Sequence, residues 1–332
     1  MLDIKLPIQI YPIVRCRKIH AYLINIMSAV PNNNFEKYII CNYLCLHNGV
    51  EKICRNYLDF HLGNNYINIV DIFKDNSWFD IIQITKIDDE NSRVCTYIKE
   101  FIIQMLHAGY FVLQNVNEGL FPHSFAYGNS VAPNICMLYG YNEYEDRFYI
   151  LDYDKYGHFG SYTISSKEYF SAVSSVPKRN RFDFIKVKET VTFSFDLKHS
   201  INLLQSQINS FNAYPDHLEY QNHIFGYASI ERSLYEAEKG QLSISDFRAI
   251  LEHKDVLSKY FQHVTQNLNL ADNCFYSHYM EINKKMHQIF MTIIKKSLSN
   301  SAKNIFSKEC DAIRIINEEE AKLINQYLSK II

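Results

Sequence analysis

The sequence predicts an α+β protein with a mixed first half and an all-α second half. Before about residue 190, short aromatic and β-branched runs alternate with helical patterns, whereas from residue 196 onward apolar residues recur only at a period of 3.6. The chain has 332 residues, which exceeds the roughly 100–200 residues of a typical domain. We therefore expect two domains, residues 1–190 and residues 191–332.

Three helices are expected early in the chain. Apolar residues at near-helical spacing predict a buried helix over residues 16–30, with Cys16 at its N-terminal end. Residues 35–46 resemble a second helix, and residues 94–106 carry the cleanest apolar stripe of the first half. Gly109 follows that stripe and is expected to end the third helix.

The remainder of the first half predicts strands. Aromatic and β-branched residues concentrate in residues 110–116, 134–141, 147–151, 158–164 and 182–188. The polar run 142–146 joins the second and third of these segments, which predicts a hairpin and an antiparallel sheet. Ser165 and Glu168 have the spacing of a capping box, so a helix is expected to start at Ser166.

The second half predicts a bundle of antiparallel helices. Its apolar stripes begin at Leu197, Phe247, Tyr279 and Ala321, and short polar segments join them. No strand pattern returns, so we expect no strand beyond about residue 196.

Composition excludes several classes of function. The net charge is −2 and the pI is about 6.7, and no Lys/Arg cluster would neutralise a row of phosphates, so nucleic acid is not an expected partner. The opening residues lack the pattern of a signal peptide, and no run of eighteen apolar residues occurs. We expect a cytoplasmic protein with no membrane segment, and the sequence does not predict its oligomeric state.

No metal or cofactor is expected. The eight cysteines are scattered, which indicates free thiols. Cys41, Cys45 and Cys54 lie near His47, but no second ligand pair follows at the distance of a zinc finger. The chain also lacks glycine-rich nucleotide-binding motifs and the His-Glu-x-x-His motif of zinc proteases.

Cys16 is the best candidate for a nucleophile. A papain-like site needs a thiolate at a helix N-terminus, where the helix dipole lowers the thiol pKa, together with an imidazole base and a group that orients it. Cys16 satisfies the first requirement, and the predicted hairpin could supply the other two groups from adjacent strands. The alternative is that Cys16 is only a small buried residue.

Two segments of the hairpin, Asn134–Asn142 and Phe148–Asp152, resemble the family of butirosin biosynthesis protein H. Residues 225–234 and 246–254 of the helical half resemble bacterial relatives found beside carrier-protein assembly lines. Each motif is short. The resemblance implies a papain-like, peptidase-C39-like first half. It also implies an acyltransferase that moves an acyl group from a carrier-protein thioester to an amine during antibiotic biosynthesis.

Carried over by position, the resemblance implies Cys16 as nucleophile, Asn134 at the place of the general base and Asp152 as the orienting carboxylate. The family has His where this chain has Asn134, although the spacing to Gly140 and Asp152 is retained. Asparagine does not accept a proton near neutral pH, and general-base catalysis contributes about 10²–10⁴-fold. Asn134 therefore indicates lost activity, a relocated base or an engineered change.

Two histidines could replace the missing base. His20 lies one helical turn after Cys16 on the same face, and His123 lies in the loop before Asn134. Each also has a plain structural interpretation, His20 as a half-buried hydrogen-bonded residue and His123 as a solvated loop residue. Asp152 is equally ambiguous, because an aspartate that ends a strand often only caps the turn.

The leading hypothesis is a cysteine-dependent acyltransferase of natural-product biosynthesis. Its implied partners are an acyl or peptidyl carrier protein, whose phosphopantetheine would hold the acyl group, and an amine acceptor. One alternative is a catalytically degenerate module that only binds a carrier protein. Another is a thioester or peptide hydrolase, which would use the same residues and admit water instead of an amine.

Overall fold

The computed structural model describes residues 2–49, 57–60, 78–85, 92–176, 181–213, 222–241, 243–268, 270–299 and 306–332. It is mixed α and β with a large antiparallel sheet, which confirms the expected fold class at that level. The chain forms two compact units: unit 1 is Met1–Phe35 with Asn68–Thr192, and unit 2 is Glu36–Ile67 with Phe193–Ile332. The expected domains 1–190 and 191–332 are each continuous, whereas unit 2 also takes residues 36–67 from the first half.

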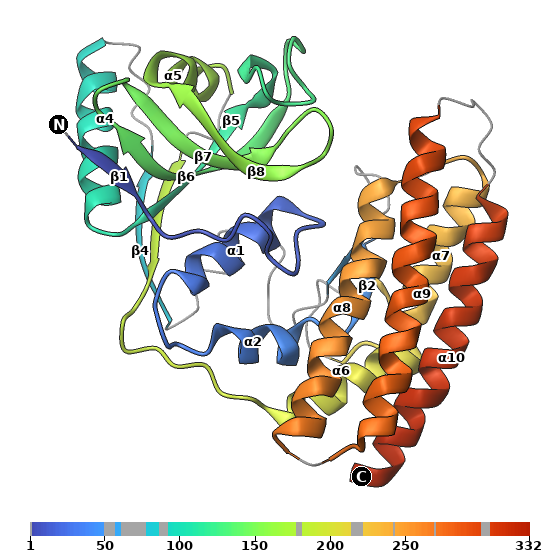
Figure 1. The fold of residues 1–332 in the computed structure, drawn as a ribbon. Coiled ribbons are helices and arrows are strands. Elements are labelled where there is room, and N and C mark those ends of the chain that lie inside the picture. The colour runs from blue at the N-terminus through green and yellow to red at the C-terminus, as the bar shows by residue number, and fades with distance from the viewer. Residues whose placement is uncertain are drawn as a thin grey trace. The chain divides into compact units, whose positions relative to one another are not determined.

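Unit 1 contains a seven-stranded antiparallel sheet (Figure 1). In spatial order its main strands are β4 (Phe79–Thr85), β9 (Arg181–Val187), β5 (Phe111–Asn117), β6 (Pro133–Asn142), β7 (Arg147–Tyr153) and β8 (Phe159–Ser165). Asn142 pairs with Arg147 across β6 and β7, which confirms the predicted hairpin. β4 and β1 (Asp3–Lys5) were not predicted from the sequence.

β1 pairs with the same edge of β6 as β5 does, beyond the first residues of β5. Its residues pair with Gly140, Tyr141 and Asn142, and the β6–β7 register shifts between Leu138 and Gly140. A Cβ atom at Gly140 would collide with the backbone oxygen of Ile4. Glycine is therefore required here by the close approach of a neighbouring strand.

Helices cover both faces of this sheet. Figure 1 shows α4 (Ser92–His107) and α5 (Ser166–Ser174) on one side and α1 (Lys18–Ser28) on the other. Residues of α4, α5 and the central strands form one hydrophobic core. On the other face, the Tyr22 hydroxyl of α1 donates a 2.9 Å hydrogen bond to the Leu151 carbonyl of β7. This bond ties the start of the chain to the strand that ends at Tyr153.

The predicted capping box of α5 is confirmed. The Ser165 hydroxyl accepts a hydrogen bond from the Glu168 backbone N–H, and the Glu168 carboxylate accepts one from the Ser165 N–H at 2.8 Å. The Ser165 hydroxyl also donates a 2.7 Å hydrogen bond to the Glu168 carboxylate, and this bond together with the one from the Ser165 N–H lowers the pKa of the Glu168 carboxyl below its usual value. The first turn of α5 is therefore fixed by the local sequence.

Unit 2 is mainly helical, but the expectation of an all-α second half is wrong. Its helices are α2 (Phe35–Asn42), α6 (Leu197–Asn209), α7 (Gly226–Glu238), α8 (Ile244–Gln266), α9 (Asn273–Leu298) and α10 (Ser307–Ile331). The strand β10 (Ile224–Phe225) pairs with β2 (Leu46–Gly49), which pairs with β3 (Tyr57–Phe60). A two-residue strand is too short to give a periodic signal.

The predicted apolar stripes of α8 and α9 form much of the unit 2 core. Ile250, Leu257 and Phe261 on α8 are fully buried, as are Tyr279 and Met286 on α9. Leu268, which follows α8, and Leu298, which ends α9, are exposed.

Among the described residues, none of the helices combines the length and apolar character needed to cross a membrane.

Candidate functional site

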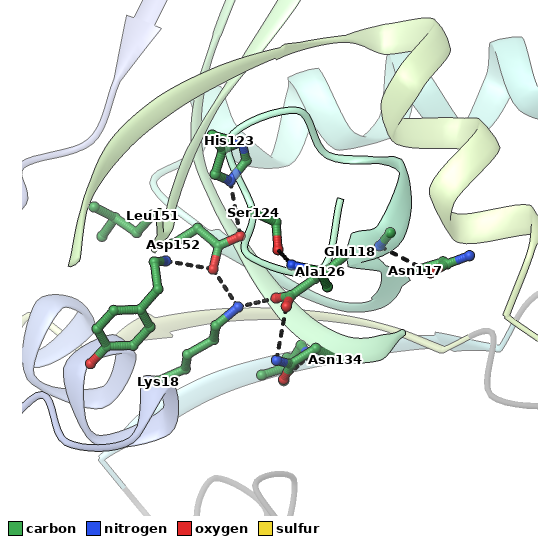
Figure 2. A network of polar contacts seen from close by, with 12 residues as sticks. Lys18, Asn117, Glu118, His123, Ser124, Ala126, Asn134, Leu151 and Asp152 are labelled. Atoms are coloured by element: carbon green, nitrogen blue, oxygen red, sulfur yellow. Dashed lines mark hydrogen bonds and ion pairs between the residues drawn. The ribbon is translucent and has the colours of Figure 1, made fainter. Parts of the chain in front are cut away.

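Four charged or ionisable side chains of unit 1 meet at one place, and we call them the site network (Figure 2). Lys18 is the first residue of α1, and Glu118 opens η1 (Glu118–Leu120), a short 3₁₀ helix directly after β5. His123 lies in the following loop, and Asp152 is the penultimate residue of β7. Segments distant in sequence therefore build one polar cluster.

Asp152 is the centre of the site network. Its side chain is fully buried, and both of its oxygens are engaged. Oδ1 accepts hydrogen bonds from the Lys18 ammonium and, at 2.7 Å, from the Tyr153 backbone N–H, while Oδ2 lies 3.0 Å from His123 Nε2. Buried carboxylates need such partners, so the orientation of Asp152 is fixed.

The His123 ring is held in a defined orientation. It stacks on Tyr162 at 4.5 Å between centroids and on Phe121 at 5.6 Å. The backbone carbonyl of His123 accepts a 2.8 Å hydrogen bond from the Lys155 N–H. Because an ionised carboxylate only accepts, Nε2 carries the proton toward Asp152, and Nδ1 is the nitrogen through which the neutral ring can act as a base.

Lys18 bridges the two carboxylates of the site network. Its ammonium contacts Glu118 Oε1 and Asp152 Oδ1. Burial alone would lower the pKa of Lys18, but the charges of Asp152 and Glu118 outweigh it and raise that pKa. Burial and the neighbouring Asp152 charge raise the pKa of Glu118, whereas Lys18 and Asn134 oppose that shift. Two carboxylates thus share one ammonium.

Asn134 reaches the site network through Glu118. It is the second residue of β6, and its amide Nδ2 donates a 3.1 Å hydrogen bond to Glu118 Oε2. Its Oδ1 accepts a 2.9 Å hydrogen bond from the Ile135 N–H. At the position where the family resemblance implies a base, this chain therefore holds a neutral amide that orients a carboxylate.

Cys16 lies just before α1 instead of in its first turn. The helix begins at Lys18 with Arg17 as its N-cap, so the predicted start at residue 16 is two residues too early. The Cys16 side chain is buried, as is His20 on α1. Lys18, which follows Cys16 by two residues, contacts Asp152, so the thiol is two residues in sequence from the site network.

No protein-family model matches this chain, and no curated protein matches it either. The site is therefore interpreted from its own geometry. Of the residues predicted for it, His123 and Asp152 are hydrogen-bonded to each other, and Asn134 joins them through Glu118 and Lys18.

Sequence reasoning missed Lys18 and Glu118. Glu118 is the last residue with a charged side chain before a long uncharged stretch that continues to Asn142, and Lys18 lies two positions after the candidate nucleophile. Both features were available as signals. However, a charged residue at a helix start or a strand end is usually solvated, so neither position alone indicates a buried ion pair.

Burial disfavours the thiolate form of four other described cysteines. Cys16, Cys41, Cys45, Cys136, Cys274 and Cys310 are not in disulfide bonds. Burial raises the pKa of Cys41, Cys45 and Cys310 to about 12 and that of Cys136 well above its usual value.

Cys54, one of the three cysteines considered as zinc ligands, lies outside the described residues. Within the described residues, no group of three or more Cys, His, Asp or Glu is arranged to hold a metal.

Proposed function

We propose that unit 1 is a papain-like, cysteine-dependent acyltransferase. It would take an acyl group from a carrier-protein thioester onto Cys16 and pass it to an amine in natural-product biosynthesis. The observation that supports this proposal best is the 3.0 Å hydrogen bond between His123 Nε2 and the fully buried Asp152, beside the helix that follows Cys16. An imidazole oriented by a buried carboxylate is the base that such chemistry requires.

The chemistry balances with these residues alone. His123 Nδ1 takes the proton of the Cys16 thiol, and the thiolate attacks the thioester carbonyl. The carbon–sulfur bond to the carrier breaks, and the carrier thiol leaves with that proton. An amine then attacks acyl-Cys16, a carbon–nitrogen bond forms, and the amine proton passes through His123 to the released Cys16 sulfur. Asp152 stabilises the imidazolium in both steps.

In this proposal the general base lies at His123 instead of Asn134. Asn134 has a different task, because its amide holds Glu118 in place beside Lys18. His20 shares α1 with Lys18, but the hydrogen bond to Asp152 comes from His123.

Alkylation tests the thiol and its base together. At pH 6.5, iodoacetamide should modify Cys16 faster than the exposed Cys274, with peptide mass spectrometry as the readout. His123→Gln should slow this labelling by at least about tenfold, whereas His20→Gln should not. Equal rates at Cys16 and Cys274 would remove covalent catalysis at this position.

Acyl transfer is tested with loaded carrier proteins. Intact-mass measurement should show an acyl adduct that is absent in Cys16→Ser, and added amines should discharge it as amides. Discharge to the free acid regardless of amine would instead assign a hydrolase. No adduct from any acyl carrier would contradict the proposal.

One observation favours a second candidate, a non-catalytic carrier-protein binding module. The Lys18 ammonium already partly neutralises Asp152, which reduces the stabilisation available to an imidazolium. Asn134→His separates the two candidates. Activity that appears only in the variant would indicate a degenerate site, whereas an active parent that the change leaves unaltered would indicate a base relocated to His123.

A further inference from the structure

The loop that carries His123 also presents apolar side chains to solvent. We call residues 120–131 the apolar loop. Its members Phe125 and Tyr127 are 84% and 61% exposed, and Leu120 and Val131 are exposed as well. Exposed apolar residues that occur singly are normal, but four within twelve residues beside a candidate site mark an interaction surface.

The apolar loop is rigidly built. The buried Asn117 side chain accepts hydrogen bonds from the Gly119 and Ala132 N–H groups, at 3.1 and 2.8 Å, and donates one to the Ser130 carbonyl at 3.0 Å. A Cβ atom at Gly119 would collide with the Asn129 backbone oxygen. These contacts bind both ends of the loop to the end of β5.

The middle of the loop is also fixed. The Ser124 hydroxyl accepts a 3.1 Å hydrogen bond from the Ala126 N–H, next to the site network (Figure 2). The Tyr127 N–H donates to the Ser124 carbonyl, and the Gly128 N–H donates to the Gly119 carbonyl. The aromatic rings of Phe125 and Tyr127 are therefore presented on an ordered backbone, which lowers the entropic cost of binding.

Charge and size restrict what this loop can bind. From Gly119 to Asn142 the chain has no Lys, Arg, Asp or Glu, so the loop offers no complement to a charged partner. Its four exposed apolar side chains are far fewer than the roughly 20–30 residues that each side of a stable protein interface contributes. These properties fit a small, uncharged, apolar group.

Phe125 follows the candidate base His123 by only two residues, so a group bound on this loop lies close to the reacting centre. We propose that the apolar loop binds the hydrocarbon part of the acyl group, and that the preferred donors are thioesters of medium-chain fatty acids. This inference rests on the proposed acyltransferase function and specifies its substrate class.

Binding is tested apart from catalysis in the Cys16→Ser protein. Isothermal titration should show that octanoyl-N-acetylcysteamine binds at least about tenfold tighter than the acetyl thioester, since burial of two methylenes already contributes that much. Phe125→Ser/Tyr127→Ser should abolish the difference. The control Tyr97→Ser/Tyr144→Ser removes two aromatic residues that are equally exposed elsewhere on unit 1, and it should retain the difference.

The outcomes separate this inference from the proposed function. Octanoyl binding that depends on the apolar loop, without any adduct in the natural protein, would overturn the acyltransferase and support the loop as an apolar binding site. Equal Cys16 acylation by acetyl and octanoyl thioesters would overturn the inference and leave the acyltransferase standing. A dimer in solution that Phe125→Ser/Tyr127→Ser dissociates would assign the loop to a second copy of the chain and also overturn the inference.

Discussion

Each unit of this protein contains a buried lysine paired with a carboxylate, and the two pairs have different surroundings. In unit 2, Lys254 of α8 contacts Glu320 of α10, and neither side chain is exposed to solvent. Two tyrosines complete that cluster, because Tyr227 and Tyr279 donate to Glu320 at 2.7 and 2.6 Å. In unit 1, the Lys18 side chain remains 12% exposed, and one of its carboxylate partners also binds His123.

The difference shows that a buried lysine–carboxylate pair can either hold helices together or orient a side chain for proton transfer. Although burial alone would raise it, the Lys254 ammonium lowers the pKa of Glu320, so this carboxylate stays ionised inside the bundle. Each of its contacts joins one helix to another, which specifies how α7, α8, α9 and α10 pack. In the site network, by contrast, the carboxylate orients a ring whose second nitrogen can still exchange protons.

The largest effect is expected from Lys254→Met. Removal of one partner leaves Glu320 buried without its cation, which should lower the free energy of unfolding of unit 2 by about 3–5 kcal/mol. Urea unfolding followed by circular dichroism at 222 nm reports on the helices of this unit. The control Lys285→Met breaks the exposed pair with Glu319 and should cost less than about 1 kcal/mol. Similar losses in both variants would show that the Lys254 pair contributes no more than a surface pair.

The free energy of unfolding of unit 2, measured against pH, should show that its buried core disfavours protonation. Burial and the adjacent Lys254 charge lower the pKa of His253 from 6.5 to about 4. The unfolded chain therefore binds a proton below pH 6.5 that the folded chain refuses until about pH 4, so unit 2 loses stability as the pH falls through this window. The loss should total roughly 3 kcal/mol.

His253→Gln tests the assignment of that pH dependence. Glutamine can still donate to the Leu44 carbonyl, to which His253 Nε2 is hydrogen-bonded at 3.0 Å, but it does not titrate. Between pH 6.5 and pH 4 the variant should lose less free energy of unfolding than the parent, with a remaining slope from His199 and His263, whose pKa values burial also lowers. An unchanged slope would place the titrating group elsewhere.

Lys18→Met should have a smaller effect than Lys254→Met if the site network is the more open of the two. Asp152 keeps its hydrogen bonds from His123 and the Tyr153 N–H, so the free energy of unfolding of unit 1 should fall by about 1.5–3 kcal/mol. Trp78, the single tryptophan, lies in unit 1 and reports on its unfolding by fluorescence. A loss as large as that of Lys254→Met would remove the distinction between the two networks.

The smallest effect is expected from the loss of a helix cap. Ser165→Ala removes the N-cap of α5 and should cost unit 1 about 1 kcal/mol, again measured by Trp78 fluorescence. Ser171→Ala, at an exposed position within the same helix, is the matched control and should be nearly neutral. Equal costs would mean that the capping box adds no stability.

Local sequence patterns predicted much of unit 1. Elements that form by pairing between distant segments were not predicted. The hairpin of β6 and β7 and the capping box of α5 depend on residues near one another in sequence, so their patterns were sufficient. β10 pairs Phe225 with His47, which is far away in the sequence, and no local pattern records such a partner. For the same reason, residues 35–46 were expected to form one helix, whereas α2 ends at Asn42 and β2 begins at Leu46.

The site could be predicted only as separate candidates. His123 and Asp152 were each identified from the sequence, but their hydrogen bond depends on how the loop after η1 meets the end of β7. Lys18 and Glu118 were missed because their burial results from tertiary packing. The spacing of residues within one segment does not say how close that segment lies to another in the folded chain.

The discontinuous make-up of unit 2 has a consequence for biosynthesis. Leu58 and Phe60 are buried within this unit, and β2 forms its sheet with β10, which follows all of unit 1 in the sequence. During translation, β2 and β3 leave the ribosome long before β10 and the helices that follow it. Unit 1 can close while the edge of β2 that pairs with β10 is still open, and unpaired strand edges are prone to aggregation. Nascent chains stalled before residue 224 should therefore recruit chaperones through the open edge of β2.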